Sequence, residues 1–148
     1  MTEIYIQTST RDIRVQKTVK AKYLLSAVVN GQHQTKDGIV CMNNATTKAA
    51  ALAALSEALG RFKRSAVIKI YISDDYVRNM LIMNMPCRWE QNGWHKYRYN
   101  RELCHESYWR TVRGLLSAHA VNYASADEIK KSQTLKEMEW RLNNVRNQ

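Results

Sequence analysis

The chain has 148 residues, and positive charge dominates its composition: 23 Lys and Arg against 13 Asp and Glu give a formal net charge of +10. A chain of this length builds one well-buried core but is short for two. Such a charge attracts polyanions at long range and says nothing about the fold. We therefore expect a single domain over residues 1–148, with nucleic acid as the leading candidate partner.

The same composition argues against several classes of protein. The three cysteines, Cys41, Cys87 and Cys104, are odd in number and far apart, so neither a disulfide framework nor a zinc knuckle is supported. The N-terminus lacks the basic start and apolar block of a signal peptide, and no apolar run approaches the roughly 18 residues that a membrane span needs. We expect a reduced, cytoplasmic protein that has no membrane partner.

Three strands are predicted in the first third of the chain. Residues 3–10 alternate apolar and polar side chains, and residues 22–30 are rich in Leu and Val. Asn30-Gly31 is a strong hairpin signal that leads into a third strand including residues 39–42. The first two strands are joined by a basic connection that contains Arg11, Arg14 and Lys17. The pattern predicts an antiparallel meander.

An alanine-rich helix follows the third strand. Thr46 or Thr47 can cap it. Its apolar face is formed by three leucines, Leu52, Leu55 and Leu59. The small alanines of the same segment would let the helix lie close to a sheet.

The most informative stretch is a strand that runs directly into a helix. Apolar residues alternate through residues 66–72 and then recur at helical spacing, so the period changes from two to about 3.6. Asp74 or Asp75 caps this second helix, which should end before Pro86, the only proline. The turn lies at the carboxyl end of a strand, where α/β proteins usually place their chemistry.

The rest of the chain begins with a basic handle at about residues 86–106, in which aromatic side chains alternate with cations. Ser107 could cap the next helix, and residues 120–124 form a last strand. After a polar loop, Thr134 and Glu137 fit a capping box. The final helix that this box opens turns four apolar residues inward: Leu135, Met138, Leu142 and Val145.

These elements, in this order, resemble a type 1 ribonuclease H. The family's fourth strand ends in T-D-S-x-Y-V, and residues 72–77 read ISDDYV; its first helix begins T-T-N-N-x-x-E-L, and residues 46–52 read TTKAAAL. Its W-x-x-x-G-W handle is similar to WEQNGW at residues 89–94, and its D-L-W helix start to ESYW at residues 106–109. The resemblance covers about residues 4–144 and implies an α/β, RNase H-like fold: a five-stranded mixed sheet, three antiparallel strands and then two parallel ones, flanked by helices.

The resemblance also implies a site, and there this sequence departs from the family. Family members hold two Mg²⁺ or Mn²⁺ ions between four carboxylates. The matching positions are Thr8, Ala51, Ser73 and Glu139, of which the last alone is acidic. Glu139 can equally be an ordinary charge at a helix edge.

Two neighbouring acids are possible substitutes for the missing ligands, namely Asp74 and Asp75. A shift of one position at a strand end turns a side chain to the opposite face, so Asp74 does not simply replace Ser73. A helix N-cap is the more ordinary role for Asp74.

We therefore expect a catalytically inactive RNase H-like protein that binds RNA, DNA or an RNA–DNA hybrid and needs no cofactor. Its candidate contacts are Arg88, Trp94, Lys96, Arg98 and Arg101 from the handle, with Arg11, Arg14 and Lys17 as a second cluster. Trp94 has an alternative role in the core. Two other functions stay open. One is a divergent ribonuclease H that cleaves RNA in hybrids with Mg or Mn bound by Glu139 and Asp74; the other is a protein-interaction module of a phage or mobile element.

Overall fold

A five-stranded sheet forms the centre of the molecule, in the order β3-β2-β1-β4-β5. The computed structural model describes residues 2–94 and 104–144, so Val145 lies outside the described residues. Its strands are β1 (Thr2–Thr8), β2 (Gln16–Val29), β3 (Gln32–Ala45), β4 (Val67–Ile72) and β5 (Ala120–Tyr123). The first three pair antiparallel, while β1–β4 and β4–β5 pair parallel. This confirms the predicted mixed sheet.

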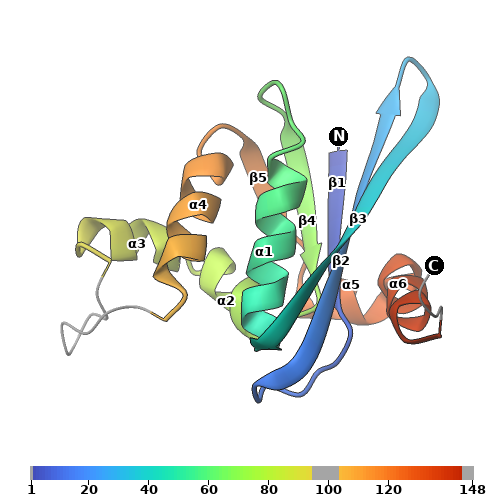
Figure 1. Ribbon diagram of the computed structural model, residues 1–148. Coiled ribbons are helices and arrows are strands. Elements are labelled where there is room, and N and C mark those ends of the chain that lie inside the picture. The colour runs from blue at the N-terminus through green and yellow to red at the C-terminus, as the bar shows by residue number, and fades with distance from the viewer. Residues whose placement is uncertain (1, 95–103, 145–148) are drawn as a thin grey trace.

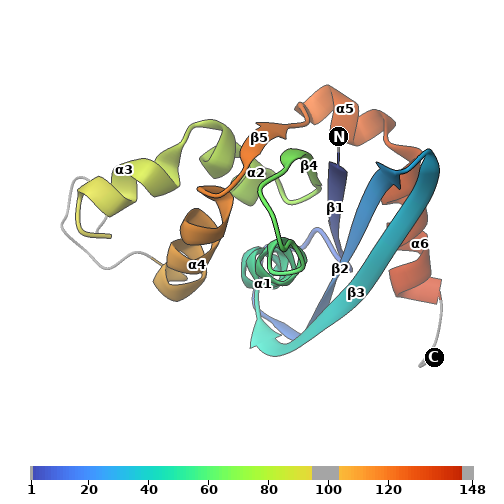
Figure 2. The ribbon, with the colours of Figure 1, turned by 90° about the horizontal axis from the view of Figure 1, so that it is seen from above.

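Helices cover both faces of the sheet (Figures 1 and 2). They are α1 (Thr47–Leu59), α2 (Asp75–Ile82), α3 (Met85–Gln91), α4 (Glu106–Leu116), α5 (Ala126–Lys131) and α6 (Gln133–Asn144). Figure 2 shows α1 on one face and α6 on the other. Within the described ranges, no helix combines the length and apolarity that crossing a membrane would require.

Two apolar clusters fill the space between these layers. The larger one joins Ile4 and Ile6 of β1 to the leucines and small alanines of α1, and the smaller one joins Tyr5 to Leu135 and Met138 of α6. Successive β1 side chains point to opposite faces, so this strand is buried on both sides. A polar side chain on such a strand therefore needs a specific partner.

The β2–β3 hairpin is longer than predicted, because β2 begins at Gln16 and not at residue 22. Lys17 is therefore part of the strand and not of a connection. The predicted turn is confirmed: Asn30 and Gly31 both have positive φ, 52° and 76°, as a two-residue hairpin turn requires. Figure 1 shows the tip of this hairpin extending beyond the rest of the sheet.

Two predicted helix starts need correction, and one helix was not predicted. The chain enters α4 at His105, so Ser107 lies inside the helix and does not cap it. The segment predicted as a polar loop contains α5, where Ser125 and Glu128 form the capping box. The box predicted from Thr134 is wrong, because α6 has already begun at Gln133. The prediction that α2 ends before Pro86 is confirmed, since a new helix, α3, carries Pro86 in its first turn.

Candidate nucleic-acid interface

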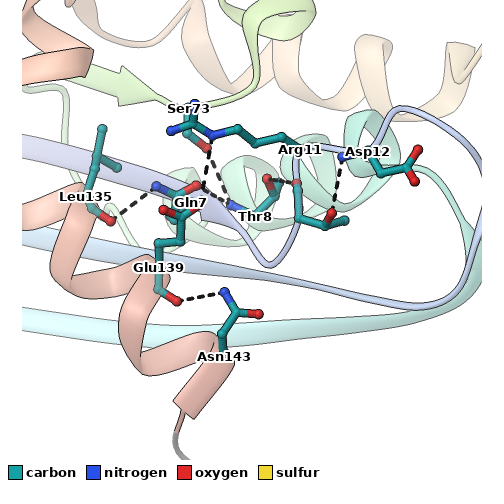
Figure 3. Close-up of polar contacts among 9 residues, drawn as sticks. Gln7, Thr8, Arg11, Asp12, Ser73, Leu135, Glu139 and Asn143 are labelled. Atoms are coloured by element: carbon teal, nitrogen blue, oxygen red, sulfur yellow. Dashed lines mark hydrogen bonds and ion pairs between the residues drawn. The ribbon is translucent and has the colours of Figure 1, made fainter.

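Two of the four positions matched to the family's carboxylates meet where β1 and β4 end. The two strands are parallel neighbours, so their carboxyl ends lie at the same edge of the sheet. The backbone N–H of Thr8 donates to the Ser73 hydroxyl at 3.4 Å, and the N–H of Ser73 donates to the carbonyl of Ile6 at 3.0 Å. Figure 3 shows Thr8 and Ser73 facing each other.

A buried glutamine connects this edge to α6. The Gln7 side chain donates from Nε2 to the carbonyl of Leu135 at 3.2 Å and accepts at Oε1 from the N–H of Thr8 at 3.0 Å. Glu139 is four residues after Leu135 in α6, one helical turn further along. Gln7 therefore ties the first turn of α6, the helix that carries Glu139, to the end of β1. No motif pointed to Gln7; the available signal was a polar residue on a strand buried on both faces.

Glu139 faces a cation at this edge. The Nε of Arg11 lies 3.9 Å from the Oε2 of Glu139, and the two side chains are 88% and 35% exposed. Figure 3 shows Arg11 turned back over the ends of β1 and β4. An ion pair this long and this exposed contributes little to stability. The pair does place a guanidinium beside the one acidic residue of the four matched positions.

The fourth position, Ala51, supplies no polar side chain. It lies on α1 and is buried in the larger apolar cluster, beside Leu52 and Leu55. A methyl group at this point supports the packing of α1 on the sheet. It has no atom that could bind a metal or a phosphate.

The two possible substitute acids are both engaged. Asp74 caps α2, because its Oδ1 accepts from the N–H of Val77 at 3.0 Å, and its Oδ2 accepts from the hydroxyl of Thr47 at 3.2 Å. The carboxylate of Asp75 pairs with the buried guanidinium of Arg78 at 2.6 Å. These contacts support the capping role for Asp74.

The donor set does not fit a divalent metal. Thr8 and Ser73 are neutral, Ala51 has no donor, and Arg11 places a positive charge beside the one remaining acid. Among residues 2–94 and 104–144, no three His, Cys, Asp or Glu side chains gather into a group that could hold an ion. Magnesium binds through anionic oxygens, so this edge of the sheet suits an anion better.

The loop after β1 carries the second predicted basic cluster. Arg14 is exposed, and its Nη2 lies 2.6 Å from the Oδ2 of Asp12. The hydrogen bonds from Arg14 hold the pKa of Asp12 well below its usual range. Lys17 is exposed at the start of β2. Arg11, Arg14 and Lys17 are thus close in sequence, and Arg11 is the one of the three that contacts Glu139.

The described part of the handle contributes one exposed cation and a packed indole. Arg88 is exposed on α3. Trp94 is buried, and the guanidinium of Arg110 lies 5.3 Å from its ring centroid. Its indole therefore packs against the body and does not offer a free face to a base. Lys96, Arg98 and Arg101 lie outside the described residues.

A further cation at the start of α1 was not predicted from the sequence. Lys48 lies in the first turn of the helix, with its Nζ 4.1 Å from the ring centroid of Tyr76. Beside it, the ring Nε2 of His105 lies 3.5 Å from the hydroxyl of Thr46. Burial, and then the charge of Lys48, lower the pKa of His105. Figure 1 shows the start of α1 between the handle and the loop after β1.

Solved structures similar to this chain include ribonuclease H proteins and viral protease-reverse transcriptases. LC9-RNase H1, a type 1 RNase H with the type 2 active-site motif, is 16% identical with a TM-score of 0.72, over 95% of this chain and 69% of that one. The RNase H domain of prototype foamy virus is 14% identical with a TM-score of 0.65, over 96% and 91% of the two chains. The foamy viral protease-reverse transcriptase in complex with an RNA/DNA hybrid is 14% identical with a TM-score of 0.65, over 93% of this chain and 20% of that one.

No protein-family model and no curated protein matches the sequence. The structural likenesses and the strand order show an RNase H-like fold.

Proposed function

We propose that this protein binds the sugar-phosphate backbone of nucleic acid without a divalent metal and does not hydrolyse it. One observation carries the proposal. The edge where β1 and β4 end brings together Thr8, Ser73 and the Arg11 guanidinium, and Glu139 is the one acid among the four positions matched to the family's carboxylates. A family member with four carboxylates repels phosphate until metal ions bind. Here that repulsion is largely gone, so a backbone can approach directly.

The overall charge and the fold support the same proposal. A formal charge of +10 favours association with a polyanion. One structure with a similar fold, the foamy viral protease-reverse transcriptase, was solved in complex with an RNA/DNA hybrid. For this chain we propose a backbone track from the loop after β1 to α3, along Arg11, Lys17, Lys48 and Arg88. Lys96, Arg98 and Arg101 are further candidate contacts from the sequence alone.

Binding in the presence of a chelator tests the proposal. Labelled single-stranded DNA, single-stranded RNA, DNA duplex and RNA–DNA hybrid are titrated with protein in EDTA, and the titrations are repeated with Mn²⁺. We expect the same affinity in both, no cleavage of the hybrid, and a Kd that rises by about 10³-fold or more between 50 and 200 mM salt if six or more phosphates are contacted.

The two other candidate functions correspond to distinct outcomes of this experiment. Cleavage of the hybrid in Mn²⁺ that stops in EDTA would show a divergent ribonuclease H and overturn the proposal. Weak binding that does not change with salt or with the type of duplex would favour a protein-interaction module.

A further inference from the structure

We propose that Arg11 takes the place of the family's metal ions, holding one phosphodiester at the ends of β1 and β4, and that Glu139 competes with this phosphate for Arg11. The inference rests on the proposed function, because it names the group through which that function reaches the nucleic acid. It goes beyond it by assigning opposite effects to two charges only 3.9 Å apart.

The backbone that carries Arg11 is held in place on both sides. The N–H of Ser9 donates to the carbonyl of Lys20 at 2.8 Å, and the Ser9 hydroxyl accepts from the N–H of Lys20 at 3.0 Å. The Thr10 hydroxyl accepts from the N–H of Asp12 at 3.2 Å. These contacts fix the start of the loop against β2. Arg11 therefore projects from an ordered backbone even though its side chain is exposed.

The groups around Arg11 suit a phosphate oxygen. A guanidinium offers parallel N–H donors that match two oxygens of a phosphate. The Ser73 oxygen accepts from the N–H of Thr8, which leaves the Ser73 hydroxyl proton for a further acceptor. Neither Thr8 nor Ala51 brings a negative charge to this edge. A phosphodiester here meets the Arg11 guanidinium and the Ser73 hydroxyl, with Glu139 as the acid paired with Arg11. Asp74, next to Ser73, is engaged in capping α2.

Glu139 lies close enough to Arg11 to compete with a phosphate for it, but it is held too loosely to keep the phosphate out. Its distance of 3.9 Å from Arg11 is longer than a hydrogen bond, and both carboxylate and guanidinium are accessible to water. Exchanging this loose partner for a phosphate therefore costs little. Because Glu139 repels the incoming phosphate and occupies Arg11, neutralising it should strengthen binding. A carboxylate that held a catalytic metal would have the opposite effect.

Matched single substitutions test this assignment, with Kd for a labelled RNA–DNA hybrid measured in EDTA. Arg11→Gln should raise Kd by about tenfold, the size expected for a hydrogen bond to a charged group, and should reduce the salt slope by about one. Its control is Arg64→Gln, which removes the same charge from the loop between α1 and β4, at the opposite end of β4 (Figure 1). That control should change Kd by less than about twofold.

For the acid, Glu139→Gln should lower Kd by about threefold, the effect of one competing charge near the surface. Its control is Glu137→Gln, on the same helix, where the carboxylate pairs with Arg141 at 2.9 Å. The control should leave Kd within about 1.5-fold. In the Arg11→Gln background the gain from Glu139→Gln should shrink, because the competition it relieves is gone.

The outcomes separate the inference from the function it rests on. If the unmodified protein does not bind nucleic acid in EDTA, the proposed function fails. If it binds and Arg11→Gln behaves like Arg64→Gln, or Glu139→Gln weakens binding, the inference alone is overturned. Thermal melting of each variant identifies a loss caused by unfolding. Arg11→Lys keeps the positive charge but loses the paired N–H donors of the planar guanidinium. It should therefore recover part of the affinity that Arg11→Gln loses.

Discussion

The Gln7 side chain joins β1 to the first turn of α6, donating to the carbonyl of Leu135 at 3.2 Å and accepting from the N–H of Thr8 at 3.0 Å. Through these two hydrogen bonds a single buried residue ties α6, which carries Glu139, to the end of β1. The link between the two elements is an uncharged amide.

Gln7→Met should destabilise the protein by about 1–2 kcal/mol, because it removes two buried hydrogen bonds while keeping the side-chain length. Urea unfolding measures the loss. Gln34→Met, at an exposed position of β3, is the control and should change stability by less than about 0.5 kcal/mol. Equal effects of the two substitutions would show that Gln7 does not hold α6 to the sheet.

Gly38→Ala should also destabilise the fold, by about 1–3 kcal/mol through overpacking. Gly38 lies opposite Tyr23 in the β2–β3 register, and a Cβ there would come within 2.5 Å of the fully buried ring. Tyr23 cannot move away freely, since its hydroxyl donates to Glu57 at 3.1 Å and accepts from Arg61 at 2.8 Å. Urea midpoints report the change.

Gly114→Ala provides the opposite case for the same chemical change. An added Cβ at this position of α4 meets no atom within 4 Å. Alanine is favoured over glycine in a helix interior by up to about 1 kcal/mol, so this variant should be more stable than the parent. A loss at Gly114, or no loss at Gly38, would contradict the packing described.

Acidification should destabilise the protein in part through His105. Its pKa is lowered in the folded state by burial and by Lys48, whereas the unfolded chain has the ordinary value of about 6.5. Between the lowered pKa and 6.5 the unfolded state binds more protons, so stability falls as the pH decreases through this window.

The comparison variant is His105→Asn, because asparagine tolerates the positive φ of 62° at this position. Urea unfolding at pH 7.5 and at pH 5.5 should show a smaller loss of stability for His105→Asn than for the parent. If both chains lose the same amount, the burial of His105 beside Lys48 has no role in the pH response.

The parts of the fold that the sequence predicts are those with strong periodicity or turn chemistry. Alternation identifies β1 and β4, and Asn30-Gly31 identifies the hairpin, because each signal depends on local sterics. The late start assigned to β2 has a physical cause: its lysines mask an alternation through Val19, Ala21, Tyr23 and Leu25, all of which are buried. In an antiparallel strand a basic residue at every second position is compatible with burial of the other face.

The short α5 was not predicted because its sequence carries no apolar periodicity. None of its residues is buried, so it has no apolar stripe and gives no periodic signal. Its capping box, Ser125 with Glu128, was the available indication. The box assigned instead at Thr134 shows that a four-residue pattern does not position a helix when its surroundings are polar.

The sequence identifies candidates for the site but not their arrangement. Aligned motifs match Thr8, Ala51 and Ser73 to acids of the family. The contact of Gln7 with Leu135 and the pairing of Arg11 with Glu139 join residues 128 positions apart in both cases, and they depend on how α6 packs on the sheet. Only the folded chain brings these groups together.

The measurement that tests the central claim most directly is a titration of the protein with substoichiometric Mn²⁺, followed by amide signals in NMR spectra. A paramagnetic ion bound at the ends of β1 and β4 would selectively broaden the amides of Thr8 and Ser73, which lie on either side of that edge. We predict that these signals lose no more intensity than those of the α1–β4 loop, and that they shift when a short oligonucleotide is added in EDTA. Selective broadening of Thr8 and Ser73 by Mn²⁺ would show that the site still holds a metal, and would contradict the account.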